Sequence, residues 1–136
     1  MKIVLDHGAF PPIRAHEDDA GLDIRSPVDV IIKPHASVLI DTGVHVAIPR
    51  GCVGFLKSKS GLMCNHDITS DGTIDAGYNG SIRVKLFNHG EWHYTIRRGD
   101  KITQLVVQRC ELPDVEIVDS LPETARGAGG LGSTGR

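Results

Sequence analysis

The chain has 136 residues, of which 40% are apolar and only 4% aromatic, and its formal net charge is −2. This length points to one domain, and the near-neutral charge excludes a general electrostatic attraction to nucleic acid. No apolar run approaches the roughly 20 residues that a membrane-spanning helix needs.

Cysteine usage and the N-terminal segment indicate the compartment. The chain has three cysteines and no CxxC pair, and this odd number favours free thiols in a reducing environment. The first apolar stretch is too short, and is followed too soon by polar residues, to be a signal peptide. We therefore expect a cytoplasmic protein that contacts neither a membrane nor nucleic acid.

Short β-branched segments follow one another along the chain, separated by turns rich in glycine, proline, asparagine and aspartate. Turns at intervals of roughly 8–12 residues predict an all-β sandwich or barrel. The expected strands are residues 3–5, 28–32, 37–40, 44–48, 53–56, 81–88, 92–96, 102–107 and 115–118.

Two segments allow a more detailed prediction. The best candidate for a helix is residues 60–65, with Ser60 as its N-cap, so we expect at most one short helix. Residues 81–88 alternate, and alternate side chains of a strand point to the same face. One face of this expected strand carries Ile82, Val84, Leu86 and Asn88.

The last eleven residues, 126–136, contain five glycines. Their composition fits a disordered tail, because the segment cannot bury enough apolar surface to fold alone. It also fits an anion-binding loop, in which glycines let backbone N–H groups approach a phosphate and Arg126, Ser133 and Thr134 supply charge and hydroxyls. We divide the chain into a β domain, residues 1–125, and this flexible C-terminal arm.

Polar groups suited to a phosphorylated substrate occur at three other places. Asp23 is either a solvated turn residue or a carboxylate near the water shell of Mg²⁺. Lys59, Ser60 and Gly61 form either a basic turn or a phosphate site. Gln104 interrupts an apolar strand, so its amide needs partners there and could orient a water molecule or a phosphate oxygen.

Residues 72–80 are typical of a hairpin, with three glycines and an Asn-Gly pair. Asp75 lies among small residues, where an accessible carboxylate could take a proton from water. Tyr78 could present its ring to a sugar. Ordinary turn chemistry accounts for the same residues equally well.

Taken in order, five segments resemble the five motifs of the homotrimeric dUTPase family. They are AGLDI, SKSGL, GTIDAGYNG, GDKITQL and RGAGGLGSTG, and they span residues 20–135. The resemblance implies a distorted jelly-roll β-barrel of the β-clip type. It also implies a homotrimer with three shared active sites, in which dUTP is hydrolysed to dUMP and pyrophosphate with Mg²⁺.

The resemblance also implies roles for particular residues. Asp75 matches the acid that activates the attacking water, and Gln104 matches a glutamine that contacts phosphate and the water site. Tyr78 matches the ring that packs against deoxyribose. The uracil edge would be read by backbone groups of Gly72, Thr73 and Ile74.

Phosphate and metal contacts follow from the same resemblance. Asp23 matches the acid that meets the metal through water. Lys59, Ser60 and Gly61 match the phosphate-binding residues of the second motif. The arm residues that match substrate-binding positions are Arg126, Leu131, Gly132, Ser133 and Thr134.

The chain departs from the family pattern at three positions. Lys59 stands where arginine is usual, which keeps the charge but loses the bidentate fork. Gly77 replaces an acid that usually precedes the tyrosine. Leu131 replaces an aromatic residue that stacks on uracil, and such stacking is worth roughly 1–3 kcal/mol.

Two other functions remain open at this point. One is a dCTP deaminase, or a bifunctional relative, on the same fold, although such chains use a glutamate near the base and residues 72–80 contain none. The other is a dUTPase-like protein that binds a regulator. That function usually depends on an inserted loop, and no large insertion separates the motifs.

Overall fold

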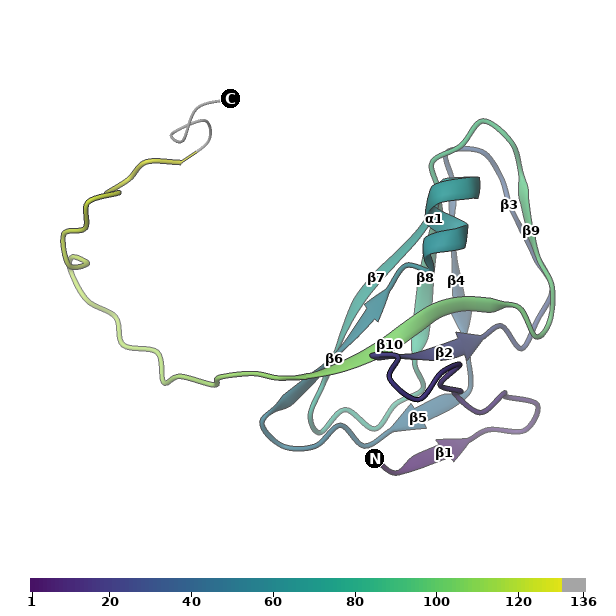
Figure 1. Cartoon of the computed structure of the whole chain (residues 1–136), viewed down its shortest axis with the longest axis horizontal. Helices are drawn as coiled ribbons and strands as arrows, with labels where there is room; N and C mark the ends of the chain where they lie inside the picture. The colour runs from purple at the N-terminus through teal and green to yellow at the C-terminus, as the bar shows by residue number, and fades with distance from the viewer. Residues whose placement is uncertain (131–136) are drawn as a thin grey trace.

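The computed structural model describes residues 1–130, which form an all-β body and an extended C-terminal segment (Figure 1). The largest sheet has six antiparallel strands in the order β2-β10-β6-β7-β8-β4. Their bounds are β2 Gly21–Arg25, β10 Lys101–Arg109, β6 Cys52–Lys57, β7 Ile68–Asp75, β8 Arg83–Asn88 and β4 Ser37–Asp41.

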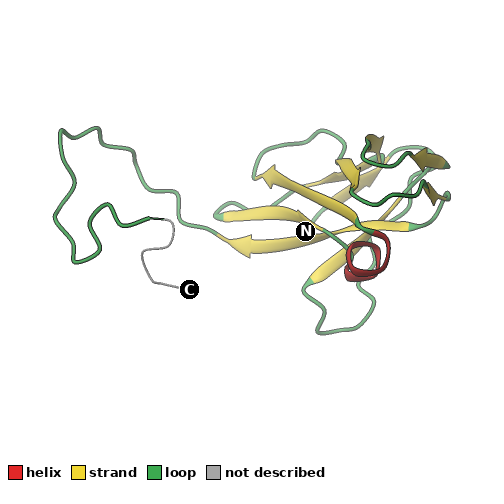
Figure 2. Cartoon of the chain, turned by 90° about the horizontal axis from the view of Figure 1, so that it is seen from above, coloured by secondary structure: helices red, strands yellow, loops and turns green. Residues whose placement is uncertain are grey.

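Two small antiparallel sheets complete the body. One pairs β1 (Ile3–Leu5) with β5 (Val44–Val46), and the other pairs β3 (Val30–Ile32) with β9 (Tyr94–Ile96). Seen from above, the strands overlap in layers, and the one helix of the described residues lies beside them (Figure 2). This arrangement confirms the expected all-β distorted jelly roll with one short helix.

Aliphatic side chains build the core, as the composition predicts. Within residues 1–130, the fifteen buried hydrophobic residues of the core are all isoleucine, valine or leucine. In β8 the exposed and buried residues alternate strictly, so that Val84, Leu86 and Asn88 face inward as predicted. Ile82 continues the same buried face just before the strand.

Three expectations about elements were wrong. Gly21–Arg25 forms β2, not a turn, because its backbone finds an open edge of β10 to pair with. Residues 68–75 form the long strand β7, which the Asp71-Gly72 pair at its centre conceals. Residues 115–118 form no strand, since no neighbouring strand within residues 1–130 pairs with them.

The helix α1 (Ser60–His66) confirms the predicted position, but its N-cap residue differs from the predicted one. Lys59 occupies the N-cap position, and no side chain caps the helix there. The helix ends at Asp67, whose left-handed backbone (φ 55°) lets its N–H bond to the carbonyl of Leu62. Because α1 buries no residue completely, it covers the body instead of forming its core.

Beyond β10 the chain runs away from the body through residues 110–130 (Figure 1). Apolar side chains of this segment are exposed, among them Val115 at 91% and Ile117 at 96%. Exposed apolar residues in such a run usually mark a surface that meets another chain. No helix among the described residues is long and apolar enough to cross a membrane.

Candidate functional site

Asp23 is a buried carboxylate held between two lysines. It lies in β2 with 4% of its surface exposed, and its carboxylate forms ion pairs with Lys59 and, at 2.7 Å, with Lys101. Burial would raise the pKa of Asp23, but the hydrogen bonds and charges of Lys101 and Lys59 outweigh it and hold the pKa below its ordinary value. Asp23 therefore stays charged at neutral pH.

Gln104 lies on β10, the strand that also carries Lys101 of this Asp23 cluster, which consists of Asp23, Lys59 and Lys101. It is directly opposite Asp23 in the β10–β2 ladder and opposite Lys57 in the β10–β6 ladder. Its amide donates a hydrogen bond of 3.3 Å to the carbonyl of Ser58. The amide of Gln104 thus faces the segment that leads from β6 into α1.

A network of hydroxyl hydrogen bonds fixes the segment between β6 and α1. Ser58 donates to the carbonyl of Ser70 and accepts from its N–H, both at 2.9 Å. The Ser70 hydroxyl lies 2.8 Å from that of Thr103, which donates to the carbonyl of Lys57. Because Ser70 and Thr103 are buried, this network is shielded from water and holds the end of β6 firmly.

Gly21 leaves the space that the Gln104 side chain occupies. A Cβ atom on Gly21 would clash with the amide oxygen of Gln104 and lie 3.1 Å from its Cβ and Cδ. Sterics therefore explain the glycine in the first motif, because any other residue at this position would displace the Gln104 side chain.

Asp75 is the last residue of β7 and is exposed. In the described part of the chain, β7 pairs with β6 along residues 71–75 but with β8 along residues 68–70. In an antiparallel ladder, alternate residues direct their N–H and C=O groups away from a given neighbour. Backbone groups between Gly72 and Ile74 can therefore meet a ligand at the edge facing β8.

Tyr78 lies in the turn that follows β7. The turn begins with a hydrogen bond from the Tyr78 N–H to the carbonyl of Asp75 at 3.1 Å, and Gly77 takes φ 103° within it. The Tyr78 hydroxyl donates to the carbonyl of Ser81 at 3.0 Å. A Cβ on Gly80 would clash with the Tyr78 ring, so this glycine lets the ring fold back over the turn.

Asp75 and Gln104 do not meet within one chain. Asp75 is opposite Val53 at one end of β6, whereas Gln104 is opposite Lys57 at the other end. Four residues of strand separate these positions, which is about 13 Å at about 3.3 Å per residue. The predicted residues therefore form two groups, one around Asp75 and Tyr78 and one around the Asp23 cluster.

Of the arm residues predicted to bind substrate, the structure describes only Arg126. Arg126 is exposed, and its Nε donates to the carbonyl of Gly129 at 2.9 Å. Leu131, Gly132, Ser133 and Thr134 lie outside the described residues.

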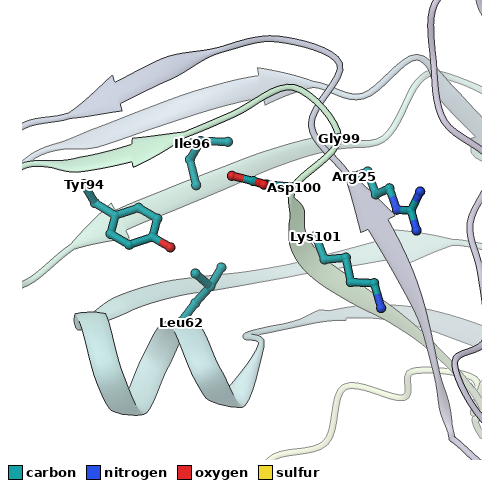
Figure 3. A pocket seen from close by; sticks show the side chains of 7 residues that line it. All are labelled: Arg25, Leu62, Tyr94, Ile96, Gly99, Asp100 and Lys101. Carbon is teal, nitrogen blue, oxygen red and sulfur yellow. The ribbon is translucent and has the colours of Figure 1, made fainter.

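A hollow next to Asp23 is lined by none of the residues that the sequence predicts for the site. It is lined by Arg25, Leu62, Tyr94, Ile96, Gly99, Asp100 and Lys101 (Figure 3). Lys101 links it to the cluster, because its side chain turns away from Tyr94 and its ammonium pairs with Asp23. Burial raises the pKa of the Tyr94 hydroxyl, with a smaller effect from Asp100.

The side chains of the site suit a metal ion that binds together with a phosphorylated substrate. No cluster of three or more histidine, cysteine, aspartate or glutamate side chains among residues 1–130 could hold a metal ion. Mg²⁺ usually keeps several waters and takes substrate phosphates plus one or two carboxylates. Asp23 is a single carboxylate opposite Gln104, and both of its oxygens pair with lysines. It suits a metal held through its water ligands and not a protein cage.

A family model described as dUTPase matches residues 9–135. The chain belongs to the dUTPase family. Two relatives are deoxyuridine 5'-triphosphate nucleotidohydrolases. The protein from Nocardia farcinica is 47% identical over 96% of this chain and 82% of its own length. The protein from Mus musculus is 39% identical over 97% of this chain and 82% of its own length.

Solved structures of dUTPases agree with this membership. A variant of the Staphylococcus bacteriophage 80alpha dUTPase with dUpNHpp has a TM-score of 0.93 at 30% identity, and the match covers 99% of this chain and 98% of that one. A variant dUTPase from phage phi11 of S. aureus, described with a structural Mg(II) ion, has a TM-score of 0.81 at 30% identity. That match covers 88% of this chain and 96% of the phage protein. The expected enzyme class, dUTP diphosphatase, is confirmed.

Sequence reasoning missed Lys101 and Ser58. Lys101 lies in the fourth motif and belongs to the Asp23 cluster, but a lysine beside a turn gives no signal until β2 and β10 are known to pair. Ser58 lies in the second motif, and its hydroxyl and carbonyl link β7 and Gln104. Its position just before two predicted phosphate-binding residues was an available signal.

Proposed function

We propose that this dUTPase-family chain hydrolyses dUTP to dUMP and pyrophosphate by attack of water on the α-phosphate. Asp75 takes a proton from the attacking water. The oxygen of that water forms a bond to the α-phosphorus, and the bond from that phosphorus to the oxygen bridging to the β-phosphate breaks. Pyrophosphate leaves with the electron pair of the broken bond.

The observation that carries this proposal is the arrangement at the end of β7. An exposed carboxylate, Asp75, adjoins a strand edge with available backbone groups and a turn that presents Tyr78. Backbone donors and acceptors along Gly72–Ile74 suit the edge of a uracil base. The Tyr78 ring suits the flat face of deoxyribose, where a ribose 2′-hydroxyl would collide.

A second group of residues suits the triphosphate. Lys59, Ser60 and Gly61 offer a cation, a hydroxyl and a backbone N–H at the start of α1. Gln104 offers an amide beside them, able to orient the attacking water or a phosphate oxygen. Asp23 would hold Mg²⁺ through its water ligands, and the metal would supply charge neutralisation on the phosphates.

The separation of the two groups supports a homotrimer with shared active sites. Asp75 and Gln104 must both lie near one water molecule, and about 13 Å of β6 separates their ladder positions within one chain. Two chains packed around a symmetry axis can supply one residue each. The exposed apolar residues of the segment after β10, such as Val115 and Ile117, suit contact with a neighbouring subunit.

The arm would complete the site. Arg126, Gly132, Ser133 and Thr134 suit the γ-phosphate, and Leu131 suits the face of the base. Closure of such a segment excludes water from the reaction and strengthens the electrostatic contacts within. Residues 1–125 would then act as the β domain and 126–136 as the closing arm.

Pyrophosphate release from dUTP and the four standard deoxynucleoside triphosphates, with and without Mg²⁺, tests the proposal. We expect release from dUTP, strongly dependent on Mg²⁺, and little from the others. Release of ammonia from dCTP would instead favour a deaminase. Equal turnover of dUTP and dTTP would contradict the proposed recognition of uracil.

A further inference from the structure

His45, at the centre of β5, faces a hydrogen-bond acceptor with each of its ring nitrogens. Its Nδ1 lies 2.8 Å from the carbonyl oxygen of Asn79, and its Nε2 lies 3.2 Å from a carboxylate oxygen of Asp6. A carbonyl and a carboxylate only accept hydrogen bonds. Because a neutral imidazole has one N–H group, both bonds form together only when His45 is the imidazolium.

Through the carbonyl of Asn79, His45 contacts the turn that carries Tyr78. Asn79 is the next residue in that turn, and two residues further on the Ser81 hydroxyl donates to Asp41. Asp41 also accepts from the Gly43 N–H at 3.1 Å, so its carboxylate is itself fixed. The exposed turn is thus tied to the body at two points, one through His45 and one through Asp41.

Three charged side chains, from the two ends of β1 and from β4, face His45. Asp6 follows β1, Asp41 ends β4, and Lys2 lines the same hollow as His45 and Asn79. Asp41 is in turn opposite Arg83 in the β4–β8 ladder. The hydrogen bond to the Asn79 carbonyl, then that to Asp6, raises the pKa of His45 above its ordinary value of 6.5.

We propose that His45, as the imidazolium, is a positioning residue that fixes the turn over residues 76–81 so that Tyr78 can meet the deoxyribose, and that loss of its proton weakens dUTP binding. The inference rests on the proposed function. His45 touches no substrate atom in this account. Asp75 keeps its place in the β6–β7 ladder when the turn loosens, so KM should respond and kcat should change little.

Kinetics from about pH 6 to about pH 9 test the proposal, because an ordinary histidine changes charge between about pH 5 and pH 8 and the pKa of His45 is raised from 6.5. The wild-type KM for dUTP should rise with pH, whereas His45→Gln should have a KM that is already about fivefold higher near pH 6.5, the effect of losing one hydrogen bond. The KM values of the two proteins should converge near pH 9. Asp6→Asn should move the wild-type rise to lower pH, because it removes the carboxylate that stabilises the imidazolium.

His93→Gln is the matched control, because it makes the same change at an exposed position between β8 and β9. Its KM should follow the wild-type profile. A wild-type KM that stays flat across this range, or that rises equally in His45→Gln, would overturn the proposal.

A readout without catalysis separates this inference from the proposed function. In NMR spectra, the Tyr78 ring signals should titrate with the same midpoint as His45, above 6.5, and should stop titrating in His45→Gln. If the Tyr78 ring signals do not change as His45 titrates, His45 does not fix the turn, and the proposal is overturned even if dUTP is hydrolysed. If the wild type releases no pyrophosphate from dUTP, the proposed function fails. The titration of Tyr78 still shows whether His45 fixes the turn.

Discussion

Asp75 and Gln104 flank the same central strand, β6, from opposite sides and at opposite ends. Asp75 is opposite Val53 across the β6–β7 ladder, and Gln104 is opposite Lys57 across the β6–β10 ladder. The two residues expected to act on one water molecule therefore cannot do so within one chain. This relationship connects the fold of the chain to the proposed shared active site.

Asp75→Asn should lower kcat by about 100-fold to 10,000-fold, the usual contribution of a general base. The amide has nearly the shape of the carboxylate, so dUTP binding should change little. Pyrophosphate release measures kcat, and calorimetry with a slowly hydrolysed dUTP analogue measures binding. Asp71→Asn is the matched control, because Asp71 is an exposed residue of the same strand. Near-normal turnover of Asp75→Asn would exclude its role as the base.

Gly21→Ala should lower kcat by about tenfold or more, because the new Cβ would displace Gln104 from the position that orients water. Circular dichroism should show an intact fold. Gly90→Ala is the control, since a Cβ there would meet its nearest neighbours at 3.4 Å, an ordinary contact distance. If Gly21→Ala is as active as Gly90→Ala, the steric role of this glycine is wrong.

Asp23→Asn should reduce the free energy of unfolding by about 1–3 kcal/mol near pH 7, because Lys59 and Lys101 lose their shared counter-charge. The pKa of Asp23 is lowered from an ordinary 3.8. The stabilisation is therefore fully present above that value and is lost as the pH falls through the lowered pKa.

Urea unfolding at several pH values measures the Asp23 effect. Asp71→Asn again serves as control: its pair with Lys57 is long, at 3.6 Å, and exposed, so its effect should stay within about 0.5 kcal/mol. An Asp23→Asn protein that loses equal stability at neutral pH and well below the lowered pKa would contradict the charge-based explanation.

Leu131→Phe should raise kcat/KM for dUTP by about threefold to tenfold, because an aromatic ring can stack on the base and leucine can only cover it. Leu121→Phe is the control, since Leu121 is an exposed apolar residue that precedes the arm. No improvement in Leu131→Phe would indicate that this residue does not cover uracil.

Elements with a clear period could be predicted from the sequence. The alternation of Val84, Leu86 and Asn88 defines the buried face of β8, and the turn residues around it mark its ends. By contrast, β2 begins at a glycine whose only visible signal is for a turn. Its strand conformation depends on β10, a partner about eighty residues away in the sequence.

The motif order identified the family and most candidate residues, but it could not give their arrangement. That Lys101 joins Lys59 at Asp23 depends on which strands pair. The hydrogen bonds of His45 to Asn79 and Asp6 join three segments that carry no common pattern in the sequence. The separation of Asp75 from Gln104 likewise becomes visible only once β6 is known to lie between them.

Mixing two inactive variants tests the shared active site most directly. Asp75→Asn and Gln104→Ala should each lose at least about 100-fold in kcat. When the two are unfolded together in equal amounts and refolded, random assembly gives about a quarter of the sites an intact Asp75 from one chain and an intact Gln104 from another. We predict recovery of about a quarter of the wild-type dUTP hydrolysis. No recovery above the two separate variants would contradict a site shared between chains.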